Sequence, residues 1–192
     1  MDDNELLKKY NDIYLEIIMR YKEHIEDKES LYVAELPKLV TPENDGVANV
    51  AKGITDKFPL YRYEEHFPEA AAKAYDYVKD VITPIALPIQ FWQKPSETLK
   101  HEAGDVFDRA VLLCSLLVAL GSASSKVIIR IRDADRSFVV YSEYNGRVIA
   151  IDLESGIREC GSREELLESL GIVKGADVTA YEFNDKMYND IA

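Results

Sequence analysis

The sequence predicts an α+β domain in which helices precede an antiparallel sheet. Helical patterns fill most of residues 5–120, and β-branched runs joined by tight turns dominate residues 126–183. Helices followed by strands are typical of α+β folds, whereas regular alternation is typical of α/β folds. We therefore expect a central buried helix packed on one antiparallel sheet, with an N-terminal helical extension.

Length and composition favour one compact domain. The chain has 192 residues, of which 47% are hydrophobic, and this is enough to bury a sizeable core. We expect residues 1–88 to form a helical region packed on a core formed by residues 89–192. The net charge of −12 disfavours nucleic acid and anionic membranes as partners. No motif indicates a cofactor.

The first twenty residues alternate charged and apolar positions, unlike a secretory signal. No apolar run approaches the roughly 18 residues that a membrane span needs. We therefore expect an acidic cytoplasmic protein. Cys114 lies in an apolar helical pattern and Cys160 in a predicted polar loop, and their spacing matches no metal or redox motif. Two free thiols are the expected state.

The N-terminal segment has the periodicity of an amphipathic helix. Apolar residues recur there at steps of three and four, namely Leu7, Tyr10, Tyr14, Ile17, Ile18, Tyr21 and Ile25. Packing of this helix on the domain's own core is the expected arrangement. A homodimer formed through residues 5–25 is the alternative.

The next segments predict two shorter helices. Residues 41–46 have the composition of a turn, and a short helix is expected over residues 47–58. Residues 68–82 contain three consecutive alanines behind Pro68, which predicts a helix with proline in its first position. Pro84 and Pro88 should end it.

The central stretch, residues 95–121, joins a Gly-Asp turn to the most apolar helix of the chain. Asp105 is a natural N-cap residue, and Asp108 is a first-turn acid favoured by the helix dipole. Gly121 should supply the C-terminal cap.

The remaining pattern predicts strands over residues 126–132, 137–144, 147–153 and 178–183, with a capping box and short helix at residues 162–171. The two-residue turn Asn145-Gly146 fixes one hairpin register, which pairs Tyr144 with Arg147 and Val139 with Asp152. In that register Ser137 lies on the same sheet face as Asp152 and diagonal to it.

Three motifs together resemble the transglutaminase-like superfamily, whose fold is related to that of papain-type cysteine proteases. They are Trp92-Gln-Lys-Pro-Ser-Glu-Thr-Leu99, Gly104-Asp-Val-Phe-Asp108 and the apolar helix of residues 110–121. In that family a Gly-Asp-Cys-x-Asp turn carries the nucleophile, a His-Ala-Trp-Val strand carries the base, and an aspartate on the next strand orients the base. The resemblance covers residues 89–154 and implies a papain-like core.

Transferred residue by residue, the resemblance places Val106 at the cysteine position, Ser137 at the histidine position and Asp152 at the aspartate position. Valine has no nucleophile and a serine hydroxyl is no general base near neutrality. The resemblance therefore implies a vestigial triad without catalysis. The cleft that it implies is formed by Trp92, Gly104, Asp105 and Phe138.

Other candidate residues have simpler interpretations. Cys114 lies two helical turns beyond Val106 and reads as a buried apolar cysteine. His101, Asp105 and Asp108 would form a metal cluster only if one helix ran through Gly104, so no metal site is predicted. Several aromatic residues of the strands could line a groove or simply pack in the sheet, namely Phe138, Tyr141, Tyr144, Tyr181 and Phe183.

Together these observations favour a non-catalytic pseudoenzyme that binds an unidentified protein or peptide. One alternative is a hydrolase or acyltransferase of altered mechanism, which would use His101 with Asp105, Asp108 or Asp152. The other alternative is an oligomeric scaffold that associates through the N-terminal helix.

Overall fold

A computed structural model describes residues 3–27, 33–86, 91–133, 135–173 and 175–192. The side chains of residues 3, 22–27, 33 and 34 lie outside this description, so it does not include those of His24 and Ile25, and Ile89 falls in a gap. The helices are α1 (Asp3–Asp27), the 3-10 helix η1 (Val33–Leu39), α2 (Asp45–Thr55), α3 (Tyr63–Val81), α4 (Pro95–His101), α5 (Val106–Ala119) and α6 (Arg163–Ser169). The strands are β1 (Thr83–Pro84), β2 (Ala103–Gly104), β3 (Lys126–Arg132), β4 (Asp135–Tyr144), β5 (Arg147–Asp152), β6 (Gly156–Cys160), β7 (Thr179–Phe183) and β8 (Tyr188–Asp190).

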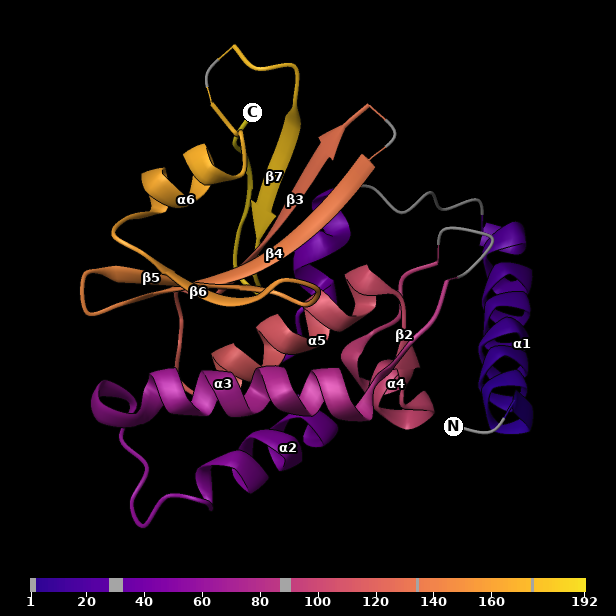
Figure 1. The fold of residues 1–192 in the computed structure, drawn as a ribbon. Helices are drawn as coiled ribbons and strands as arrows, with labels where there is room; N and C mark the ends of the chain where they lie inside the picture. The colour runs from indigo at the N-terminus through magenta and orange to yellow at the C-terminus, as the bar shows by residue number, and fades with distance from the viewer. Residues whose placement is uncertain (1–2, 28–32, 87–90, 134, 174) are drawn as a thin grey trace.

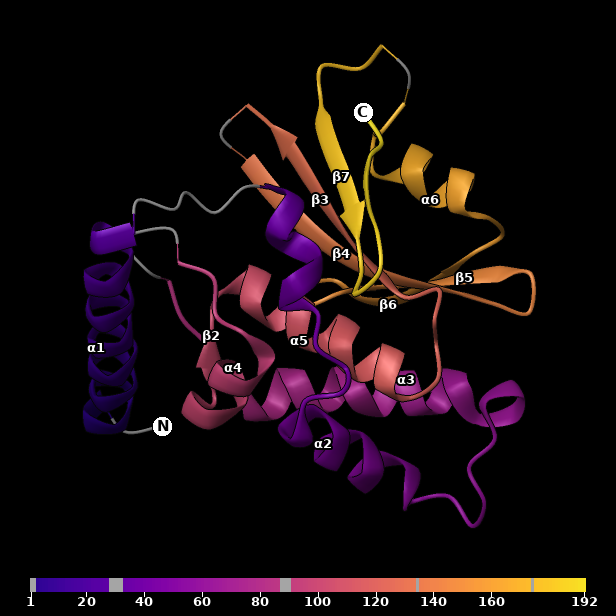
Figure 2. The same ribbon diagram turned by 180° about the vertical axis from the view of Figure 1, so that it is seen from behind.

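The predicted α+β class is confirmed. Six strands form one antiparallel sheet in the order β6-β5-β4-β3-β7-β8. Helix α5 packs on one face of this sheet with α2 and α3 behind it, and α6 lies on the other face (Figures 1 and 2). Helix α1 stands at the outer edge of the molecule beside β2 and α4. Among the residues described, no helix combines the length and the apolar character needed to cross a bilayer.

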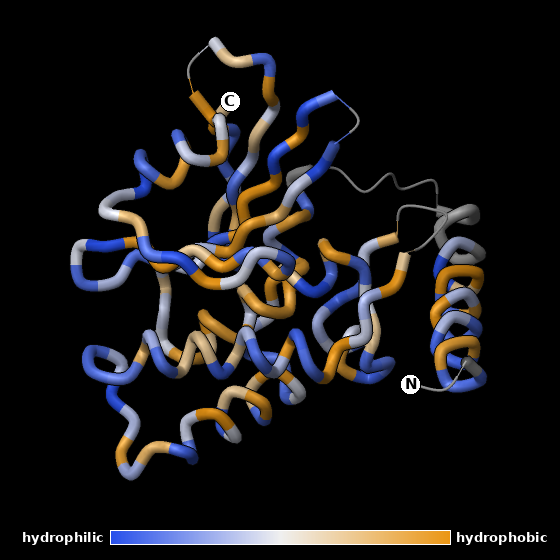
Figure 3. The backbone as a smooth tube through the Cα atoms, in the orientation of Figure 1, coloured by the Kyte–Doolittle hydropathy of each residue, from blue (hydrophilic) through white to orange (hydrophobic). Residues whose placement is uncertain are grey.

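The core centres on α5, whose residues 107–117 are all buried. Figure 3 shows hydrophobic residues along α5 and along the strands above it. Asp105 begins this helix as its N-cap, and its side chain accepts a hydrogen bond from the N–H of Asp108. Gly121, at φ 104°, adopts the left-handed conformation just beyond the helix, which glycine tolerates without steric cost. The predicted cap residues at both ends are therefore confirmed.

The hairpin register is also confirmed. Tyr144 pairs with Arg147 and Val139 pairs with Asp152, as the two-residue turn requires. Asn145 and Gly146 both have positive φ, which matches the preferred turn for a two-residue hairpin. The two turn residues Asn145 and Gly146 were thus sufficient to predict how β4 pairs with β5.

Helix α3 begins earlier than predicted, at Tyr63, so that Pro68 lies inside it. Proline has no N–H to donate to the carbonyl four residues before it, here that of Glu64. The Tyr144 hydroxyl donates a hydrogen bond to this carbonyl at 2.5 Å instead. A contact from the distant hairpin therefore satisfies the group that Pro68 leaves without its helical partner.

Several short elements were not predicted. These are η1, the parallel pair β1 and β2, and the edge strands β6 and β8. The prediction that Cys160 lies in a polar loop is wrong, because it ends β6 and is buried against α6 with Leu166 and Val148. The pair β1 and β2 joins segments on either side of α4, whereas β6 and β8 pair with the strands that directly precede them, β5 and β7.

Candidate functional site

The N-terminus of α5 is built around two aspartates that cap each other's backbone. Asp105 Oδ1 accepts a hydrogen bond from the N–H of Asp108 at 2.8 Å, and Asp108 Oδ2 accepts one from the N–H of Asp105 at 3.1 Å. This reciprocal capping box satisfies donors that the first turn of a helix leaves without partners. It fixes the direction in which α5 leaves the Gly104-Asp105 turn.

Asp108 also holds the chain segment that precedes α4. Its side chain is fully buried and accepts hydrogen bonds from the backbone N–H of Gln93 at 2.8 Å and from Gln93 Nε2 at 3.0 Å. Burial raises the pKa of Asp108 to about 8, with a further contribution from the charge of Asp105, although these hydrogen bonds oppose the shift. Burial also raises the pKa of Asp105. The Asp108 carboxyl group therefore retains a proton at pH values where an ordinary aspartate is ionised.

A pocket of about 250 Å³ lies beside this turn. Its walls come from η1, the segment before α4, the start of α5 and strands β3, β4 and β7, and its lining residues are Leu36, Trp92, Asp105, Phe107, Ile129, Ile131, Arg136, Phe138 and Tyr181. Phe107 forms part of the wall, and its ring centroid lies 5.4 Å from that of Trp92 and 5.5 Å from that of Phe138. The pocket is thus aromatic, with one carboxylate and one guanidinium among its lining groups.

The structure brings together three of the four residues expected to form the cleft, since Trp92, Asp105 and Phe138 line the pocket. Gly104 is buried behind the turn instead. A Cβ atom there would lie 3.0 Å from Cβ of Asp108 and 3.2 Å from Cγ2 of Thr98. Gly104 therefore permits close packing of the turn against α4 and does not line the cavity.

Sequence reasoning missed several lining residues. Phe107 follows Val106 directly, and its place in the motif could have marked it. Leu36 comes from η1 and carried no signal, because its position depends on a contact between η1 and the sheet. Tyr181 was one of five aromatic candidates, and only it and Phe138 from that set line the pocket.

Val106 occupies the first position of α5, with 37% of its surface exposed. It is not among the residues that line the pocket. The side chain at the expected nucleophile position therefore faces solvent at the start of the helix and does not plug the cavity.

Ser137 lies on the sheet face opposite α5. Along β4, Phe138 and Val140 pack in the cluster that contains the α5 leucines, whereas Val139 and Tyr141 pack in the cluster that contains α6. Alternation along a strand places Ser137 with the second pair. Its hydroxyl accepts a hydrogen bond from Nη1 of Arg130, its cross-strand neighbour, at 3.4 Å.

Asp152 lies on the same face as Ser137, as the hairpin register predicted. Its neighbour Ile151 packs in the α5 cluster, so alternation directs Asp152 away from α5. Asp152 Oδ1 accepts hydrogen bonds from the N–H groups of Glu154 and Ser155, at 2.8 and 2.9 Å, in the turn after β5. The vestigial triad does not converge, because the sheet separates Ser137 and Asp152 from α5.

The positions of β4 that do face α5 at this level are Arg136 and Phe138, and both line the pocket. An arginine guanidinium stays protonated and cannot accept a proton, and phenylalanine has no titratable group. The residues of β4 that face α5 are thus the two neighbours of Ser137, and neither of them can act as a general base.

Cys114 is fully buried within α5, and burial raises the pKa of its thiol well above the usual range. Cysteine acts as a nucleophile in its thiolate form. Cys114 is therefore a packed core residue, as its apolar neighbours indicated.

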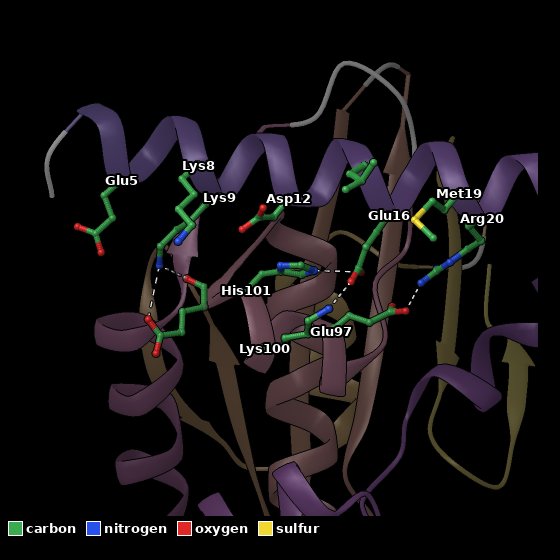
Figure 4. Close-up of a pocket in the computed structure, with 12 residues that line it drawn as sticks. Glu5, Lys8, Lys9, Asp12, Glu16, Met19, Arg20, Glu97, Lys100 and His101 are labelled. Atoms are coloured by element: carbon green, nitrogen blue, oxygen red, sulfur yellow. Dashed lines mark hydrogen bonds and ion pairs between the residues drawn. The ribbon is translucent and has the colours of Figure 1, made fainter.

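His101 lines a different cavity, a groove of about 780 Å³ between α1 and α4 (Figure 4). Its Nε2 lies 3.0 Å from Oε2 of Glu16, whose other oxygen lies 2.6 Å from Nζ of Lys100. Burial raises the pKa of Glu16, but the hydrogen bonds from His101 and Lys100 outweigh this effect and lower it. His101 thus fastens α1 to α4 and is not a member of the aromatic pocket.

Two further ion pairs fasten α1 across the same groove. Lys9 pairs with Glu102 at 3.6 Å, and Arg20 pairs with Glu97 and donates to the carbonyl of Trp92 at 3.0 Å. This larger cavity therefore lies between α1 and the body of the protein and is lined mainly by charged side chains, and we call it the charged groove. Within the described residues, no group of three or more His, Cys, Asp or Glu side chains has an arrangement that could hold a metal ion.

The chain resembles known proteins in its structure but not in its sequence. No family model matches the chain, and no curated protein matches its sequence. The structure is similar to that of Legionella pneumophila LapG, with 16% identity, a TM-score of 0.51, and coverage of 82% of this chain and 87% of that one. It also matches a proposed protease of Parabacteroides distasonis, with 16% identity and a TM-score of 0.47, over 82% of this chain and 30% of that one. The chain therefore shares the fold of LapG, and this likeness agrees with the transglutaminase-like fold that the sequence motifs predicted.

Proposed function

We propose that this chain is a non-catalytic protein with a transglutaminase-like fold, which binds an apolar side chain of a polypeptide in the pocket beside α5. The observation that carries the proposal is an aromatic pocket at the start of α5 where the expected nucleophile position is Val106. A pocket that has no catalytic nucleophile can still bind an apolar side chain.

The residues around the pocket support the absence of catalysis. Cysteine-type acyl transfer needs a nucleophile and a base within hydrogen-bond reach of each other. Val106 offers neither, and the nearby positions of β4 that face α5 are Arg136 and Phe138. Ser137 and Asp152 lie beyond the sheet.

The size and lining of the pocket support a peptide side chain as its occupant. Small-molecule sites typically enclose about 300–1,000 Å³, so a pocket of about 250 Å³ fits one side chain better than a whole ligand. Trp92, Phe107 and Phe138 supply apolar walls. Asp105 and Arg136 supply an acceptor and donors for polar groups of a bound chain.

An acid-based hydrolase is less well supported. Asp105 and Asp108 have raised pKa values, which active-site carboxylates often share. However, Asp108 is fully buried, both carboxylates cap α5, and His101 is engaged with Glu16 in the groove beneath α1. Asp105 lines the aromatic pocket, whereas His101 lines the charged groove, so the acid and the histidine that this mechanism requires lie in different cavities.

Binding can be measured through Trp92, the only tryptophan of the chain. The probes are blocked hexapeptides of glycine and serine with one central Leu, Phe or Asp. We expect the Leu and Phe peptides to shift the Trp92 emission and the Asp peptide to leave it unchanged. Phe138→Glu should abolish the shift, whereas Tyr77→Ser, in a separate groove between α2 and α3, should retain it.

Failure of every peptide to shift the emission at millimolar concentration would refute the binding proposal. A second assay tests catalysis by following acyl release from peptide amides and thioesters. We expect none. Release that disappears in the Asp152→Ala variant would show that the chain is an enzyme after all.

A further inference from the structure

Helix α1 concentrates the exposed apolar surface of the molecule. Ten large hydrophobic residues are exposed in the part of the chain that the structure describes, and five of them lie on this one helix, namely Leu7, Leu15, Ile18, Met19 and Tyr21. Their exposed fractions range from 47% to 65%. Figure 3 shows hydrophobic bands alternating with hydrophilic ones along α1. Exposed apolar residues gathered in one place typically mark an interaction surface.

The fold does not use this surface to hold α1 in place. Ile13 and Ile17 pack with Ile85, Phe91 and Ala103 of the body in one buried cluster. Three further α1 residues are half buried against this cluster, namely Leu6, Tyr10 and Tyr14. The ion pairs of the charged groove fasten a second side of the helix (Figure 4). Leu15 and Met19 line the charged groove, whereas the exposed surface of Leu7, Ile18 and Tyr21 needs another explanation.

These three residues share a row with the exposed Asn11 and the half-buried Tyr14, and this row has the spacing of a coiled coil. Steps of four, three, four and three residues connect the members of one row, namely Leu7, Asn11, Tyr14, Ile18 and Tyr21. A row with this seven-residue repeat is the seam through which two helices supercoil. At about 100° per residue, the row lies roughly 90° around the helix from the docked Ile13 and Ile17. We call it the α1 seam.

We propose that the α1 seam binds the α1 seam of a second copy of this chain, in a parallel two-stranded coiled coil. Asn11, which is exposed, is the one polar member of the row from Leu7 to Tyr21. In a parallel pair of identical helices, Asn11 faces Asn11 of the partner, and each amide offers both donors and an acceptor. A single asparagine at such a position typically specifies register at some cost in stability.

Charge and position agree with a second copy as the occupant. The chain carries a net charge of −12, yet the α1 seam contains no acidic residue, so the contact surface itself escapes like-charge repulsion. Helix α1 lies at the outer edge, with the rest of the molecule on one side of it (Figures 1 and 2). With the docked row about a quarter turn from the seam, a twofold axis parallel to α1 places the two bodies on opposite sides of the coil.

The extent of the seam predicts a weak dimer. Two copies together would bury on the order of 1,000 Å², which is near the lower limit for a specific interface. The dimer should therefore dissociate on dilution. It rests on α1 alone and is independent of peptide binding in the aromatic pocket.

Sedimentation equilibrium of the full chain over a range of micromolar concentrations tests the interface. We expect the mean mass to rise from the monomer value of 21.8 kDa toward twice that value. The double variant Leu7→Glu with Ile18→Glu should stay monomeric. The control Leu60→Glu, at a position that is 63% exposed but outside α1, should associate as the wild type does. A monomer at every concentration, or equal loss of association in the control, overturns the proposal.

The register is tested by oxidative cross-linking. Asn11→Cys should yield a disulfide-linked dimer, whereas Asp12→Cys, one residue off the seam, should not. The native thiols of Cys114 and Cys160 are buried and should contribute little background. Circular dichroism of each variant checks that the helix remains folded. Equal cross-linking of both variants, or of neither, contradicts the parallel arrangement.

Discussion

The carboxylate of Asp108 accepts a hydrogen bond from the backbone N–H of Gln93 at 2.8 Å, across fifteen residues of chain. A second bond from Gln93 Nε2 reaches its other oxygen at 3.0 Å. Through these contacts the first turn of the buried helix α5 fixes the segment that carries Trp92. The same carboxylate caps the helix, so one side chain determines both the start of α5 and one wall of the aromatic pocket.

Replacing Asp108 by alanine should destabilise the protein strongly. The substitution removes the acceptor of two buried donors, both from Gln93, and of the partly buried N–H of Asp105. Each unsatisfied buried donor costs about 1–3 kcal/mol, and we expect a total loss of about 3–5 kcal/mol after relaxation. Urea unfolding followed by circular dichroism measures the change. A loss below about 1 kcal/mol would mean that water replaces the carboxylate.

Asp108 should also make stability depend on pH. Its pKa is raised from 3.8 to about 8, so between these values the folded state holds a proton that the unfolded state releases. The contribution of Asp108 to stability is therefore fully present below pH 4 and is lost as the pH rises toward 8.

The Asp108→Asn variant, whose side chain does not titrate, should show a flatter curve of unfolding free energy against pH over this range. Asp76→Asn, at an exposed position of α3, is the matched control and should follow the wild-type curve. Parallel curves for wild type and Asp108→Asn would show that the carboxyl group is ionised in the folded protein.

Two glycine substitutions should have opposite effects. Gly104→Ala places a Cβ atom 3.0 Å from Cβ of Asp108, which should cost about 1–3 kcal/mol through overpacking. Gly53→Ala, inside α2, meets no atom within 4 Å and should stabilise the protein by about 0.5–1 kcal/mol through helix propensity. Thermal unfolding of both variants measures the difference. Equal effects would rule out a tight approach at Gly104.

Tyr144 and Pro68 should be coupled energetically. Tyr144→Phe removes the hydrogen bond to the Glu64 carbonyl and should cost about 0.5–1.5 kcal/mol. In the Pro68→Ala background the cost should be smaller, because the new N–H at position 68 can donate to the same carbonyl. A double-mutant cycle measures this coupling. Additive effects would indicate that the two donors do not share the acceptor.

Much of the local structure was predictable because short-range chemistry determines it. The turn Asn145-Gly146 determined the pairing of Val139 with Asp152, and Asp105 and Gly121 marked the two ends of α5. The early start of α3 was not predictable, because Pro68 inside the helix leaves the Glu64 carbonyl without its helical donor, and the hydroxyl that bonds to this carbonyl comes from the distant Tyr144. The pocket was predictable only in part, since Leu36 reaches it from a segment without a clear pattern.

The sequence by itself determined that Ser137 and Asp152 share a sheet face, because strand alternation and a two-residue turn leave no other arrangement. Only the tertiary structure decided that this face lies away from α5, so that Arg136 and Phe138 approach the helix instead. The apolar pattern predicted for α1 did not include Ile13, and only the packing of Ile13 and Ile17 showed which side of the helix the body covers. Periodicity fixes which residues lie together on an element, whereas the choice of the buried face depends on contacts between segments far apart in the chain.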